Sequence, residues 1–197
     1  MPRRLLALVV TALVGLVGAG CADDVSPALR IGDTKIGNEA FLDEVAEWAG
    51  NPVAIDPSVL AGSSPGTYPL ELVRQLLQQR IDFELHNQEF EALGLELDDD
   101  LRDGALAALF GDPSASVDAF SAFSDEFAQQ FTDDIARQIA VEQELGPNEY
   151  NAWRAEAYAE ADIEVSPRYG TWDGESGQIT PPQGPIGSAT TQPAFGQ

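Results

Sequence analysis

Basic residues, histidine and cysteine are all scarce in this chain of 197 residues. It carries 10 Lys and Arg against 33 Asp and Glu, a formal net charge of −23. Nucleic acids and anionic lipid surfaces attract clustered Lys and Arg and repel acidic proteins, so we expect neither as an electrostatic partner. The single Cys and the single His exclude an intrachain disulfide framework and a Cys/His zinc site. We therefore expect no metal and no cofactor.

The sequence offers few candidate catalytic residues. A Ser-His-Asp site could use only His86, whose place in a helical pattern predicts a surface residue. The acidic run at 98–103 lacks the alternating ligands and the glycine of an EF-hand loop, and its place at a helix start favours a capping role. The sequence predicts a protein that is not an enzyme, with no catalytic and no metal-binding residues.

The first 21 residues have the pattern of an export signal. Two arginines precede an apolar run over residues 5–19, which is too short to span a bilayer but suits a secretory signal. The run is followed by Gly-Ala-Gly-Cys at 18–21, which resembles the lipobox of bacterial lipoproteins. That resemblance implies a signal peptide over 1–20 and a lipidated Cys21 that anchors the chain at the extracytoplasmic face of the cell membrane. Plain secretion with an unmodified Cys21 is the alternative.

Hydrophobic periodicity predicts one mainly α-helical domain over residues 29–173, after a tether at 21–28. Residues 29–36 alternate in polarity around Gly32 and Asp33, which is typical of two short strands joined by a tight turn. Five helices are expected, at 38–49, 70–93, 98–110 and 117–145, with the fifth beginning at 147.

The segment after the last helix predicts a closing strand followed by a tail. Ile163 and Val165 alternate with polar residues, and a lone strand would leave its backbone groups unpaired. The opening strand is the expected partner, so the two form a small β pair. Residues 174–197 are rich in Gly and Pro and contain no Lys or Arg, which favours a disordered tail.

A stripe of phenylalanines marks the fourth expected helix. It consists of Phe120, Phe123, Phe127 and Phe131, continued by Ile135 and Ile139. Mid-stripe positions such as Phe127 and Phe131 are expected in the core. Phe120 and Phe123 lie where the helix is expected to begin and to outrun its neighbours, so they are the candidates for an open apolar surface that binds polypeptide segments.

The layout resembles the N-terminal chaperone module of the SurA, PrsA and trigger-factor group of folding factors. The resemblance is carried by four segments: RIGDTKIGNEAF at 30–41, LVRQLLQQRI at 72–81, EALGLELD at 91–98 and VSPRYGTW at 165–172. It implies a five-helix fold of that type with a small β pair. The parvulin isomerase domain of that group has no counterpart here, since the connection at 111–116 is short and one His cannot form a parvulin site.

What the resemblance implies is a lipid-anchored, non-catalytic, chaperone-like module that binds unfolded or exported polypeptides. The strongly acidic surface favours basic clients and suppresses self-association. Two alternatives remain open: a folding factor related to peptidyl-prolyl isomerases, and an accessory subunit of a cell-envelope complex.

Overall fold

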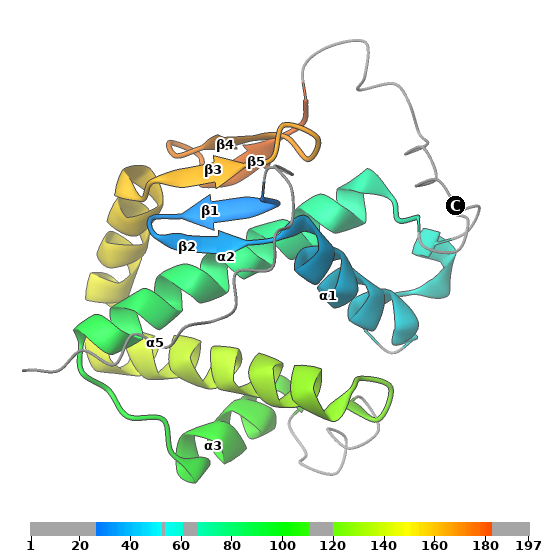
Figure 1. The fold of residues 1–197 in the computed structure, drawn as a ribbon. Helices are drawn as coiled ribbons and strands as arrows, with labels where there is room; N and C mark the ends of the chain where they lie inside the picture. Colours follow the sequence, from blue (N-terminus) through cyan, green and yellow to red (C-terminus); the bar gives the residue numbers. More distant parts are fainter. Residues whose placement is uncertain (1–26, 53, 61–66, 111–119, 183–197) are drawn as a thin grey trace, which may run out of the picture.

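The computed structural model describes residues 27–52, 54–60, 67–110 and 120–182. This part of the chain is mainly helical, with two small antiparallel sheets (Figure 1). Its helices are α1 (Asn38–Gly50), α2 (Leu70–Ala92), α3 (Asp99–Phe110) and α5 (Asp125–Glu160), with a 3₁₀ turn η1 at Pro57–Leu60. Its strands are β1 (Leu29–Ile31), β2 (Thr34–Ile36), β3 (Ile163–Val165), β4 (Thr171–Asp173) and β5 (Gln178–Thr180). None of the described helices is both long and apolar enough to cross a membrane.

Helix α2 runs through the middle of the molecule, with the strands on one side and the first half of α5 on the other (Figure 1). Its apolar side chains recur every three or four positions along most of its length, so one face is buried throughout. The N-terminal part of that face contributes Leu77 and Ile81 to a core shared with Phe41 and Val45 of α1. At the other end, Phe90 joins a second, smaller core with α5.

The described residues form four helices where five are expected, because the last two adjoin without an intervening loop and together make up α5. Gly146 has non-helical backbone angles inside α5, with φ 68° and ψ 166°, and Pro147 follows it, so the predicted boundary at these two residues is a kink between two helical segments. The kink turns the second half of α5 toward the strands (Figure 1).

Helix α5 also begins later than the phenylalanine stripe predicts. Its N-cap is Ser124, whose hydroxyl accepts a hydrogen bond from the Phe127 backbone N–H at 3.3 Å. Phe120 and Phe123 therefore precede the helix in a turn closed by a bond of 2.9 Å from the Phe123 N–H to the Phe120 carbonyl. Residues 117–119 of the expected helix lie outside the described part.

The expected pairing of the opening and closing strands is confirmed. Strand β1 lies between β2 and β3, and it pairs antiparallel with both. Leu29 faces Val165 across the β1–β3 pair, and Ile31 faces Ile163. The expected tight turn between β1 and β2 is present, with Gly32 at a φ of 55° that glycine adopts without strain.

The prediction that residues 174–197 form a disordered tail is wrong for the first of these residues. Strand β5 lies within it and forms an antiparallel hairpin with β4. The amide of Gln78 on α2 holds the outer edge of β5: Nε2 donates to the Gly177 carbonyl at 3.0 Å, and Oε1 accepts from the Ile179 N–H at 3.2 Å. Ile179 also packs against the main core, so tertiary contacts order a segment whose composition alone favours disorder. Residues 183–197 lie outside the described part.

Candidate functional site

Six aromatic side chains from three parts of the chain meet around Trp48 of α1, and we call them the aromatic cluster. Its members are Trp48, Phe83, Phe120, Phe123, Phe127 and Phe131. The Trp48 ring lies 5.3 Å from Phe123, 5.8 Å from Phe127 and 5.0 Å from Phe131, each in an edge-to-face arrangement. Such pairs contribute about 0.5–1.5 kcal/mol each beyond their buried area.

Most of the aromatic cluster stays in partial contact with water. Phe83 is buried, but the other five members are only half-buried. Phe127 and Phe131, which are expected in the core, are therefore only half-buried, and their rings pack on Trp48 and on each other. Phe120 and Phe123 belong to the same cluster, with their rings 5.9 Å apart.

A shallow hollow borders the aromatic cluster between α1 and the turn before α5. Its volume is about 420 Å³, and it is lined by Asp43, Ala46, Glu47, Gly50 and Ala122. Four of these residues are on α1, and the fifth directly precedes Phe123. A bond of 3.0 Å from the Ser124 backbone N–H to Glu47 Oε2 joins the two walls. The hollow thus combines small apolar residues with two carboxylates.

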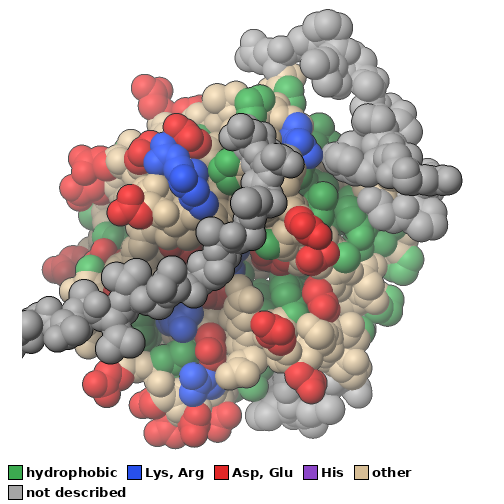
Figure 2. All heavy atoms as spheres, viewed as in Figure 1, with side chains coloured by type: hydrophobic (Ala, Val, Ile, Leu, Met, Phe, Trp, Pro, Cys, Tyr) green, Lys and Arg blue, Asp and Glu red, His purple; other side chains and the backbone are tan. Residues whose placement is uncertain are grey.

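The two chain segments that line the hollow carry only acidic charges. Helix α1 carries Glu39, Asp43, Glu44 and Glu47 and no Lys or Arg. Residues 120–134 carry four further acidic residues and again no Lys or Arg. In Figure 2, acidic side chains lie beside hydrophobic ones over the part of this face that α1 occupies. The local field therefore favours cationic ligands over anionic ones.

A network of charged and amide side chains lies at the junction of α1, α2 and α5, next to the cluster. Asp134 is buried and binds Arg80 at 3.2 Å, Arg137 at 3.4 Å and the Asn87 amide at 2.9 Å. Burial raises the pKa of Asp134 against the opposing effects of Asn87 and Arg80. Burial likewise raises the pKa of Glu44 to about 7, while Arg80 lowers it and Asp134 raises it further. These groups fix the helices against one another.

The prediction of a surface position for His86 is wrong. Its side chain is only 1% exposed, because Tyr150 and Trp153 from the second half of α5 pack against it. Nδ1 lies 2.6 Å from the Asp82 carbonyl, which can only accept, so Nδ1 carries the proton. Nε2 then accepts from the Tyr150 hydroxyl at 2.9 Å. Burial lowers the pKa of His86, which matches this neutral form.

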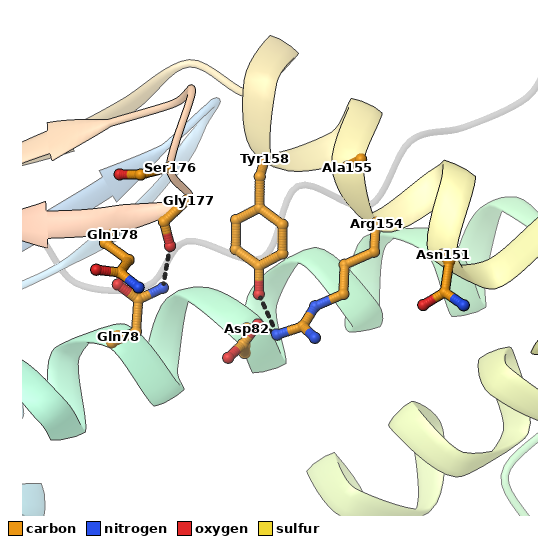
Figure 3. Close-up of a pocket in the computed structure, with 9 residues that line it drawn as sticks. All are labelled: Gln78, Asp82, Asn151, Arg154, Ala155, Tyr158, Ser176, Gly177 and Gln178. Carbon is orange, nitrogen blue, oxygen red and sulfur yellow. Dashed lines mark hydrogen bonds and ion pairs between the residues drawn. The ribbon is translucent and has the colours of Figure 1, made fainter.

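A second cleft of about 420 Å³ lies between α2, the second half of α5 and the β4–β5 hairpin (Figure 3). Several of its polar groups bind one another. Arg154 contacts Asp82 at 3.4 Å and the Tyr158 hydroxyl at 3.3 Å, and its guanidinium lies 5.3 Å from the centre of the Tyr158 ring. Figure 3 shows the Gln78 amide directed at the Gly177 carbonyl, the bond that holds the hairpin. These contacts hold α2, the second half of α5 and the β4–β5 hairpin together.

The remaining expectations concern the acidic run and the N-terminus. The capping role of the acidic run is confirmed, since Asp98 accepts from the Leu101 N–H at 2.8 Å. Arg102 binds Asp99 at 3.0 Å and Asp133 at 2.7 Å, which joins α3 to α5. Cys21, the expected lipidation site, lies outside the described residues.

Comparisons with known proteins give no match: no family model, no curated protein and no solved structure is similar to this chain. Ideas about its function therefore depend on the residues described above. Of the two sites, the aromatic cluster with its hollow leaves ring faces and carboxylates partly open to solvent. In the cleft of Figure 3, Asp82, Arg154 and the Gln78 amide are engaged by internal contacts.

Proposed function

We propose that this protein is a lipid-anchored, extracytoplasmic and non-catalytic chaperone-like module that binds unfolded or exported polypeptides. In this proposal it is a relative of the N-terminal module of SurA-type folding factors without a parvulin domain. The observation that supports the proposal is the aromatic cluster, with five half-buried rings beside an acid-lined hollow.

The partly exposed rings of the cluster are suited to binding many different sequences weakly. Unfolded polypeptides expose apolar side chains, and covering the remaining ring surface removes apolar area from water on both partners. Edge-to-face contacts with Trp48 hold the rings in place, so little side-chain entropy is lost on binding. Phe120 and Phe123 are the members on a turn outside the helix, which makes them the proposed client-binding residues.

The proposal of a non-catalytic role has support in how the titratable groups are used. His86 is buried and bonded through both ring nitrogens. The charged groups of the second cleft, Asp82 and Arg154, bind each other. His86 is thereby closed off from a substrate, and the Asp82 carboxylate is engaged by Arg154.

The proposed anchor is Cys21. A lipidated cysteine would hold the acidic domain at a membrane whose anionic headgroups repel it, because acyl chains bind through apolar burial. We expect Cys21→Ser to block lipid attachment and signal cleavage at this site. Detergent partitioning and intact mass would measure this, and an unmodified Cys21 in the mature wild-type protein would contradict the proposed anchor.

Client binding can be tested with a fluorescein-labelled peptide in which Leu alternates with Ser, followed by fluorescence anisotropy. We expect the wild type to bind it and the double variant Phe120→Ser/Phe123→Ser to lose most of the binding. The matched control is Val59→Ser/Leu70→Ser, which removes two exposed apolar side chains outside the cluster, 48% and 39% exposed in the wild type. Unfolding curves for both variants establish that they fold.

The outcomes separate the proposal from its rivals. Equal loss of binding in both double variants would mean that the cluster has no special role. Capture experiments from membranes distinguish a chaperone, which binds many partners weakly, from an accessory subunit, which binds one partner at a fixed ratio. Acceleration of prolyl isomerisation in a peptide substrate would instead support the isomerase alternative.

A further inference from the structure

We infer that the hollow beside the aromatic cluster binds a Lys or Arg side chain of the client, so that the preferred clients are apolar segments carrying basic residues. The inference rests on the proposed function, since it assigns a side-chain preference to the same surface. It names one occupant, a cationic side chain in an extended polypeptide.

The carboxylates of the hollow are arranged to meet one cation. Asp43 and Glu47 are four residues apart on α1, so their side chains project from the same face one turn apart. The Ser124 N–H occupies one acceptor position of the Glu47 carboxylate and orients it. A carboxylate offers about four such positions, so the others are available to a guanidinium or ammonium group.

The remaining walls of the hollow leave room for the stem of a long side chain. Ala46, Gly50 and Ala122 carry a methyl group or a single hydrogen where larger residues would fill the space. The methylene groups of Lys or Arg can lie against such small apolar walls while the charged end reaches the carboxylates. Ala122 directly precedes Phe123, so the turn that lines the hollow also carries a ring of the cluster, within reach of a neighbouring apolar residue of the same client.

Charge complementarity decides which side chain the hollow selects. Helix α1 and residues 120–134 contain no Lys or Arg, so an incoming cation competes with no resident one on these segments. An acidic client would bring like charges together without a counter-ion from the protein. The net charge of −23 adds long-range attraction for basic segments, which salt screens over about 10 Å at 0.1 M.

The test uses three labelled peptides of equal length in which Leu alternates with Arg, Ser or Glu. Two charge-assisted contacts should make the wild type bind the Arg peptide about tenfold more tightly than the Ser peptide, with the Glu peptide weakest. Asp43→Asn/Glu47→Gln should reduce the Arg preference to about twofold while leaving the Ser peptide bound as before. The Gln side chain retains an acceptor for the Ser124 N–H, so the wall is preserved.

The control is Asp100→Asn/Asp103→Asn, which removes the same two charges from exposed positions on α3. It should keep the Arg preference. If the wild type binds Arg and Ser peptides equally, or if the α3 variant loses the preference as fully as the α1 variant, the inference is overturned while the proposed function stands. If the Ser peptide fails to bind the wild type at all, the proposed function itself fails.

Discussion

The substitution Glu44→Gln tests how α1 is held against the rest of the domain. Glu44 is half-buried one turn before Trp48, where Arg80 and Asp134 act on it from α2 and α5. Its pKa is raised from 4.5 to about 7, with burial as the largest cause. Between these two values the side chain is neutral in the folded protein and ionised in the unfolded chain.

A carboxyl group with a raised pKa makes stability fall as the pH rises. The native state binds more protons than the unfolded state, so the contribution of Glu44 is fully present below pH 4.5 and is lost as the pH rises through about 7. At about 1.36 kcal/mol per pH unit, ionised Glu44 costs about 3 kcal/mol. Water reaching the half-buried side chain lowers this cost to about 2 kcal/mol. Gln is neutral at every pH and avoids the cost.

Urea unfolding followed by tryptophan fluorescence measures the effect. We expect Glu44→Gln to match the wild type at about pH 4 and to exceed its free energy of unfolding by about 2 kcal/mol at about pH 8. Glu39→Gln is the matched control, because it removes one charge from an exposed position on the same helix and should give no such gain. A difference between Glu44→Gln and wild type that is equal at both pH values would refute this account of the α1 junction.

Three further substitutions test local features of the fold. Gly170→Ala should destabilise the protein by about 2 kcal/mol or more, because a Cβ there would lie 2.3 Å from the Thr180 carbonyl oxygen at a φ of 143°. Gly104→Ala, in open space on α3, should instead raise the free energy of unfolding by about 1 kcal/mol, and a loss would contradict its helical role. Gln78→Leu should cost about 1–3 kcal/mol and speed amide exchange at Ile179; unchanged exchange would mean that the clamp on β5 contributes nothing.

The strand pairing was predictable because it depends on information within the strands themselves. Alternating polarity predicts a short strand on each side of Gly32 and another at Ile163 and Val165. Each strand has backbone groups that need hydrogen-bond partners, and no other segment shows the same alternation. The β4–β5 hairpin carries no comparable signal. Its order comes from Gln78 on α2, about 100 positions away, and from the packing of Ile179 on a core that the sequence does not display.

The start of α5 was mispredicted although a signal was present. Phenylalanine spacing continues without a break across Ser124, and that periodicity favoured a helix reaching back past Phe120. Ser124 is followed by Asp125 and Glu126, a cap with acidic residues in the first turn, which marks a helix start. His86 gave no such signal, since Tyr150 reaches it only because the kink at Gly146 redirects the helix.

The candidate site could be predicted in its residue types but not in its arrangement. Phe120 and Phe123 stood out from spacing alone, whereas Trp48 is 75 residues from Phe123 and nothing in α1 identifies it as the centre of the cluster. Acidic residues on an isolated helix indicate a solvated face. The bond between Glu47 and the Ser124 N–H contradicts the prediction of a purely solvated face, because it brings the acidic face of α1 against the turn that carries the phenylalanines. Apolar rings and carboxylates thereby become one surface, and its proposed preference for basic, apolar segments follows from that contact.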